Sequence, residues 1–191
     1  MPNGDEISQA IAAVKAYGSA RKQFRGAQGT LPHLLAGNDN KVGVCGEFWA
    51  KLFYLSRGYS LGEGLASNNE GHDFVCFIAG EPCRVSVKVV SDESKTGAQL
   101  PLKESENWDE LLLVLLDEEM VPWKFGLVTR AQFNLAIEQK AIGKAPTVRR
   151  SWLGPKGWME RYGDSFNGDF NGLGRSKTVP KATQAYANVA N

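Results

Sequence analysis

The apolar run at residues 111–116, Leu-Leu-Leu-Val-Leu-Leu, restricts the fold of this chain more than any other feature of the sequence. Successive side chains of a strand point to opposite faces of a sheet, so a strand with one solvated face alternates apolar and polar residues. This run is apolar at both parities, and it is short for a buried helix. It therefore predicts a central strand that is covered on both faces by other elements.

The segments before this run predict two helices and a hairpin. Apolar residues recur at helical spacing over residues 5–24 and 44–57, which predicts an amphipathic helix in each range. Residues 73–79 and 83–90 are extended runs separated by Gly80-Glu81-Pro82. Two such runs around a short turn predict an antiparallel hairpin.

The segments after the run complete an α/β pattern. Residues 122–128 predict a further strand, and Thr129 with Gln132 forms a capping box that opens a helix ending near residue 140. A short helix is expected near residues 156–162. Helices and strands in this order predict an α/β fold with a central mixed sheet flanked by helices.

Length and composition indicate one domain with a C-terminal extension. The chain has 191 residues, of which 42% are hydrophobic and 23% are charged, and these values are typical of a globular domain. We assign residues 1–146 to the α/β core. Residues 147–191 are expected to form a basic extension, rich in Gly and aromatic residues, that packs on this core.

Some classes of protein do not fit the sequence. No apolar run approaches the roughly 18 residues of a membrane span, and the N-terminus has no basic and apolar segments of a secretory signal. Cys45, Cys76 and Cys83 are odd in number and form no CxxC pair, which argues against a disulfide framework and a zinc knuckle. We therefore expect no membrane partner and a cytoplasmic location.

Positive charge is concentrated in the last part of the chain. Residues 139–191 contain nine Lys and Arg against three Asp and Glu, whereas residues 1–138 contain 13 against 18. This asymmetry predicts contact with a polyanion, although a solvated basic tail would show the same charges. Trp152, Trp158 and Tyr162 could stack on bases or pack into the core. The residues predicted to bind nucleic acid are Arg149, Arg150, Lys156, Arg161, Arg175 and Lys177.

The predicted hairpin brings chemically useful residues together. Because side chains alternate along a strand, Ser86 and Lys88 share one face of the second strand. Asp73 begins the first strand, so the turn brings it beside the end of the second strand that carries Lys88. An acid and a lysine in a cleft can hold a hard divalent cation and position a water for attack on phosphate. A phosphodiesterase needs this chemistry.

This stretch resembles the PD-(D/E)XK nuclease superfamily, which includes many restriction endonucleases and resolvases. The matching residues are Gly71-His72-Asp73-Phe74-Val75 and Arg84-Val85-Ser86-Val87-Lys88-Val89-Val90, and the resemblance covers about residues 44–140. It implies a restriction-endonuclease-like core and a Mg²⁺-dependent DNA endonuclease, in which Mn²⁺ can substitute. It also implies a role in restriction or anti-phage defence, with a homodimer supplying one site for each DNA strand.

The resemblance also implies roles for individual residues. Asp73 would be the metal-binding carboxylate, Lys88 the lysine that orients the nucleophilic water, and Glu47 a helix acid that binds the metal or orders a metal-bound water. Each residue also has a structural interpretation. Asp73 could cap the hairpin, Lys88 could extend to solvent from its strand, and Glu47 could pair with Lys51 one helical turn away.

Ser86 departs from the superfamily pattern. The matching position usually carries Asp or Glu, and serine is a poor Mg²⁺ ligand beside a carboxylate. Some restriction enzymes that resemble this pattern also have Ser here and take the missing carboxylate from a downstream helix. Glu104 and Glu106 are the nearest candidates for that substitution and would complete the metal site. The alternative is a catalytically degenerate nuclease-fold module that binds nucleic acid or a partner protein.

Overall fold

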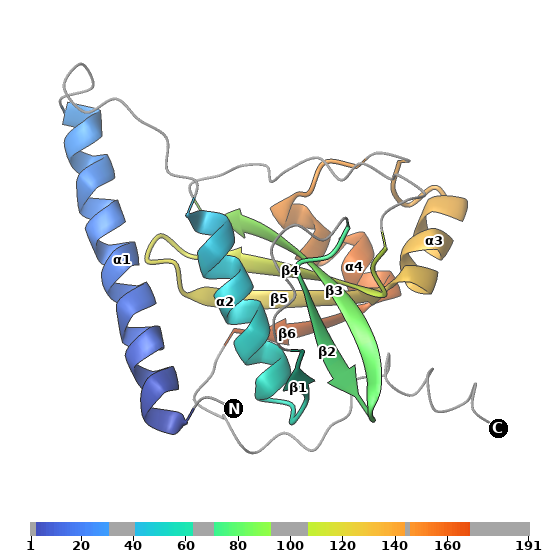
Figure 1. The fold of residues 1–191 in the computed structure, drawn as a ribbon. Coiled ribbons are helices and arrows are strands. Elements are labelled where there is room, and N and C mark those ends of the chain that lie inside the picture. The colour runs from blue at the N-terminus through green and yellow to red at the C-terminus, as the bar shows by residue number, and fades with distance from the viewer. Residues whose placement is uncertain (1–2, 31–40, 63–70, 93–106, 144–145, 169–191) are drawn as a thin grey trace.

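The computed structural model describes residues 3–30, 41–62, 71–92, 107–143 and 146–168 (Figure 1). Its core is one six-stranded sheet in the order β1-β2-β3-β4-β5-β6. Neighbouring strands are antiparallel except β3 and β4, which are parallel. The strands are β1 (Ser60–Leu61), β2 (Phe74–Ile78), β3 (Glu81–Ser91), β4 (Glu110–Leu116), β5 (Pro122–Thr129) and β6 (Asp164–Asn167).

Helices cover the sheet and make the fold α/β, as the sequence predicts. They are α1 (Gly4–Thr30), α2 (Val42–Leu55), α3 (Arg130–Glu138), α4 (Trp158–Tyr162) and the 3₁₀ helix η1 (Arg150–Leu153). Figure 1 shows α1 and α2 beside one another, away from α3 and α4. In the part of the chain that is described, no helix is both long enough and apolar enough to cross a bilayer.

The strand β4 is the covered central strand that its apolar run predicts. Each residue from Leu111 to Leu116 is at most 1% exposed. Residues of one parity, including Leu112 and Val114, pack in a cluster with α1 and α2. Residues of the other parity, including Leu111 and Leu113, pack in a second cluster with α3, η1 and α4. The alternation of side chains along one strand therefore supports three layers.

Helix α2 lies directly against β3. A Cβ atom added to Gly46 would come within 2.1 Å of Val89 Cγ2, so the helix backbone contacts the strand where glycine leaves space. Trp49 and Phe53 of the same helix are buried in the cluster beneath it. This close approach fixes the position of Glu47, the next residue along α2.

The hairpin turn differs from the predicted one. The prediction placed Gly80-Glu81-Pro82 in the turn, but Glu81 and Pro82 belong to β3 and pair with Ile78 and Phe77. The turn is Ala79-Gly80, with φ angles of +53° and +91°, and two positive φ angles are the mark of a type I′ turn. The pairing of β3 with β4 begins only at Val85. Pro82, which has no backbone N–H to donate, therefore fits within β3 because no described strand lies on its β4 side.

Other element boundaries also differ from the predictions. Helix α1 continues to Thr30 rather than ending near residue 24, and β1 and β6 were not predicted. The two residues of β1 and the polar sequence of β6 carry too little apolar periodicity to indicate a strand.

The structure decides between the two alternatives for the C-terminal tryptophans, stacking on bases or packing into the core. Trp152 and Trp158 are buried in the second cluster, so both pack into the core.

The capping box at Thr129 is confirmed, and it provides a stability test. Thr129 Oγ1 accepts a hydrogen bond from Gln132 N at 3.2 Å, and Gln132 Oε1 accepts one from Thr129 N at 2.8 Å. We expect Thr129→Ala to lower the free energy of unfolding by about 1 kcal/mol, because the first turn of α3 loses an acceptor. Urea denaturation measures the change, and Thr129→Ser, which keeps the hydroxyl, serves as the control. Equal stability of Thr129→Ala and the wild type would contradict this role.

Candidate active site

The candidate site lies just before the start of β2, where β3 continues past its partner strand. The first paired residues of this hairpin are Phe74 and Val85, so β3 extends past the start of β2. Asp73 N donates to Val85 O at 2.8 Å. The carboxylate Oδ2 of Asp73 then accepts a hydrogen bond from Val87 N at 2.5 Å. A carboxylate oxygen of Asp73 thus accepts the bond that a backbone carbonyl would accept if the β2–β3 pairing continued. The side chain of Asp73 therefore provides the last hydrogen bond between these two segments.

Ser86 supports this arrangement from within the sheet. Its side chain is only 3% exposed, and its hydroxyl donates to Asp73 Oδ2 over 3.5 Å. Alternation along β3 places the side chain of Lys88 on the same face as that of Ser86, and Lys88 is half-buried there. Ser86 therefore forms a hydrogen bond to the Asp73 carboxylate and does not supply a second carboxylate at this position.

Glu47 approaches this edge from α2. It is half-buried, and burial raises the pKa of its carboxyl above the ordinary value. The negative charge of Asp73 raises this pKa further, while Lys51 and then Lys88 lower it. Such mutual effects require the groups to lie near one another. Glu47 of α2 therefore lies within electrostatic range of Asp73, which precedes β2, and of Lys88 on β3.

The chemistry of these donors suits a hard cation. Within the described ranges, no three His, Cys, Asp or Glu side chains form a group that could hold a metal ion. The charge of Asp73 reaches Glu47 strongly enough to raise the pKa of its carboxyl, and Mg²⁺ is commonly bound by one or two carboxylates together with waters. Glu104 and Glu106 lie outside the described residues. Mg²⁺ binding by Glu47 and Asp73 therefore stays a prediction.

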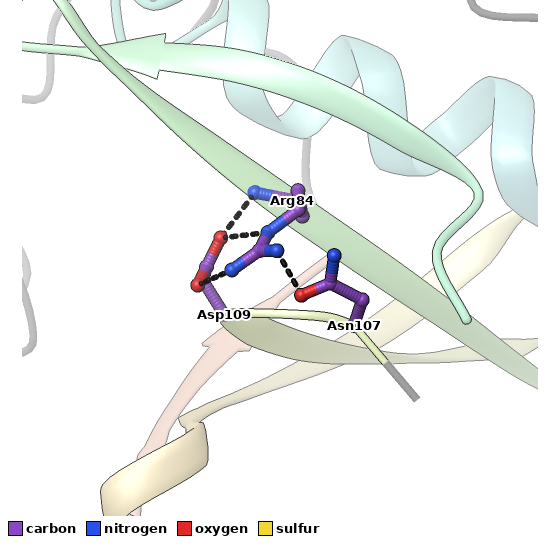
Figure 2. Close-up of polar contacts among 3 residues, drawn as sticks. All are labelled: Arg84, Asn107 and Asp109. Atoms are coloured by element: carbon purple, nitrogen blue, oxygen red, sulfur yellow. Dashed lines mark hydrogen bonds and ion pairs between the residues drawn. The ribbon is translucent and has the colours of Figure 1, made fainter. Parts of the chain in front are cut away.

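A cluster around Arg84 fixes the strand next to the site (Figure 2). The guanidinium of Arg84 donates from Nε to Asp109 Oδ2 at 2.9 Å and from Nη2 to Asp109 Oδ1 at 2.8 Å. Its Nη1 also bonds Asn107 Oδ1, and its backbone N donates to Asp109 Oδ2 at 2.8 Å. These hydrogen bonds hold the pKa of Asp109 below its ordinary value. They tie β3 to the residues that lead into β4, two positions before Ser86.

The predicted basic residues divide into three groups. Arg149, Lys156 and Arg161 line a cleft of about 780 Å³ formed by residues of η1, α4 and the segments before them. Arg150 forms an ion pair with Asp92 and lies over the ring of Trp123, 4.8 Å from its centroid. The remaining two, Arg175 and Lys177, fall outside the described residues. The first two groups lie along the C-terminal part of the fold.

Sequence reasoning missed Trp123. This side chain is 39% exposed, in contrast to the buried Trp152 and Trp158. The register shifts between Leu115 and Leu116 opposite this part of β5, and a bulge re-aims a side chain that alternation would otherwise place. The sequence around Trp123, between Pro122 and Lys124, does not indicate this bulge, and so it does not indicate that the ring is exposed.

Comparison with known proteins gives no assignment for this chain. No protein-family model matches the sequence, and no curated protein sequence matches it. The chemistry of the site is therefore inferred from the arrangement of its own residues.

Proposed function

We propose that this protein is a metal-dependent nuclease of the PD-(D/E)XK type that hydrolyses phosphodiester bonds in DNA. The observation that supports the proposal is the bond of Asp73 to Val87 N of β3, together with the electrostatic effect of Asp73 and Lys88 on Glu47. A helix acid, a hairpin acid and a strand lysine in this order resemble the superfamily. The α/β fold with its mixed sheet is consistent with that resemblance.

Each residue has a distinct role in this proposal. Asp73 and Glu47 would hold Mg²⁺, for which Mn²⁺ can substitute. The bound cation would supply Lewis-acid polarisation of the phosphate and increase the acidity of a bound water. Lys88 orients the attacking water and stabilises the negative charge that develops on the phosphate. Ser86, through its hydroxyl, orients Asp73.

The wider biological setting belongs to the proposal as well. The basic C-terminal segment favours a polyanionic substrate such as DNA. A homodimer would provide one site for each strand of a duplex. The three free cysteines are all buried, which fits a protein of the reducing cytoplasm. Restriction or another defence against phage is the process that the superfamily resemblance suggests.

One alternative function has a specific observation in its favour. Ser86 stands where the motif acid is expected, and Asp73 Oδ2 is already bonded to Val87 N. A nuclease-fold module that has lost catalysis and only binds nucleic acid or a partner protein would tolerate both features. Cleavage and binding must therefore be measured separately.

The defining experiment measures cleavage of supercoiled plasmid by the purified protein with Mg²⁺, Mn²⁺ or EDTA. We expect cleavage that depends on metal, and Lys88→Met should lower its rate by about a hundredfold, since one stabilising donor is removed. Lys15→Met, at an exposed position of α1, is the matched control and should cut normally. Single-stranded DNA and RNA are tested in parallel.

Binding of the same substrates in EDTA distinguishes the two candidates. Binding without cleavage of any substrate under any metal condition would overturn the nuclease and favour the degenerate module. Cleavage that persists in Lys88→Met at the wild-type rate would contradict the assigned site.

A further inference from the structure

We infer that the cleft beside η1 and α4 holds one nucleotide of a single nucleic-acid strand, with its phosphate on the cationic wall. The inference rests on the proposed function in taking a nucleic-acid strand as the source of that nucleotide. The site itself lies apart from Glu47, Asp73 and Lys88, none of which lines the cleft.

The charge of the cleft favours a phosphate. Arg149, Lys156 and Arg161 line it, and none of the described residues that line it is Asp or Glu. The one acid of α4, Glu160, is bonded to Lys124 and to Ser165. Because Lys124 forms an ion pair with Glu160, this carboxylate does not cancel the positive charge of the neighbouring Arg161. Three cations at one cleft form an anion site of the kind that phosphates occupy.

The other walls favour a ligand with a flat apolar part. Ile142, Pro146, Trp152 and Trp158 contribute to the lining. Trp158 is 6% exposed, and its indole N–H has no acceptor among the described residues. Buried donors are normally satisfied. A volume of about 780 Å³ lies in the range of small-ligand sites, and it accommodates a nucleotide but not a duplex.

A second hollow favours a strand over a free nucleotide. This hollow, of about 500 Å³, shares Arg149, Ser151 and Gly154 with the cleft and is also lined by Trp123 and Arg150. Trp123 is 39% exposed although the Arg150 guanidinium lies over its ring, and aromatic rings combined with arginines are the surfaces on which bases stack. Two hollows that share a cation fit successive nucleotides, with a phosphate near Arg149.

The first test measures anisotropy of a labelled single-stranded oligonucleotide and a labelled nucleoside monophosphate in EDTA. We expect the triple variant Arg149→Gln/Lys156→Gln/Arg161→Gln to bind both at least tenfold more weakly and to show a smaller salt slope. Its matched control is Lys15→Gln/Lys22→Gln/Arg25→Gln, which removes the same charge from α1. Circular dichroism establishes that both variants are folded. Unchanged binding by the folded cleft variant would overturn the inference.

The second test separates the strand from a free nucleotide. Trp123→Ala should weaken oligonucleotide binding about tenfold, since one base loses its platform, and should leave the monophosphate unaffected. Phe24→Ala, at an exposed aromatic of α1, is the control. The wild type should bind the oligonucleotide more tightly than the monophosphate, and equal affinities would overturn the strand assignment.

These readouts separate the inference from the proposed nuclease. Binding in EDTA does not require catalysis, so a cleft that binds in a protein that never cuts would support the inference while overturning the nuclease. A protein that cuts, with oligonucleotide binding unaffected by the triple variant, would do the reverse.

Discussion

Asp73→Asn is expected to lower metal-dependent cleavage by about a thousandfold while changing the free energy of unfolding by less than about 1 kcal/mol. The amide oxygen of Asn can still accept the hydrogen bond that Val87 N donates to Asp73 Oδ2 at 2.5 Å. A neutral amide, however, is a much weaker ligand for a hard cation than a carboxylate. The substitution therefore separates the ladder role of Asp73 from its chemical role.

Asp73→Ala completes this test because it removes both roles. Alanine has no side-chain acceptor, so the N–H of the buried residue Val87 loses its hydrogen-bond partner. We therefore expect the free energy of unfolding to fall by about 1–3 kcal/mol. Plasmid cleavage and urea denaturation are measured on both variants. Near-normal cleavage by Asp73→Asn would remove Asp73 from the chemistry. Equal stability of the Ala and Asn variants would instead show that the bond to Val87 contributes little.

The sequence predicts the identity of the site residues better than their contacts. Alternation along the strand places Ser86 and Lys88 on one face, and the hairpin pairing places Asp73 opposite them. The sequence does not indicate that the Asp73 carboxylate accepts a hydrogen bond from Val87 N, because that contact depends on where β2 begins. The position of Glu47 over β3 likewise depends on the close approach of Gly46 to Val89, which is a tertiary feature.

The fold shows the same division between local pattern and tertiary context. The run that becomes β4 and the capping box at Thr129 carry strong local signals, and both predictions are confirmed. The turn was misplaced because Pro82 is usually a strand breaker, and it is tolerated here only because one side has no strand neighbour. Strand β6 pairs with β5 although its own sequence gives no strand pattern.

Glu110 is a buried acid whose environment the sequence does not reveal. An acid at the start of an apolar strand suggests a solvated end, yet Glu110 is only 2% exposed. Tyr54 Oη donates to Glu110 Oε2 at 2.6 Å. Burial raises the pKa of Glu110, while hydrogen bonds from Tyr54 and Cys83 act in the opposite direction. Burial also raises the pKa of Tyr54, so the tyrosine remains a donor.

The raised pKa of Glu110 makes stability depend on pH. The native state holds the proton more tightly than the unfolded state, so ionising Glu110 costs stability as pH rises from the unfolded pKa through the folded one. This cost is absent below the unfolded pKa and complete above the folded pKa. Glu110→Gln remains neutral throughout and keeps an acceptor for Tyr54. We therefore expect the stability of Glu110→Gln to increase relative to the wild type between pH 4 and pH 8.

Glu110→Ala should show the structural contribution of the same side chain. It leaves the Tyr54 hydroxyl without its acceptor and opens a cavity under α2, and we expect a loss of about 2–4 kcal/mol near pH 5. Urea denaturation at several pH values compares the wild type, both Glu110 variants and Glu81→Gln, an exposed control on β3. Parallel pH profiles for the wild type and Glu110→Gln would contradict the raised pKa. A stable Glu110→Ala would show that the Tyr54 hydroxyl finds another partner.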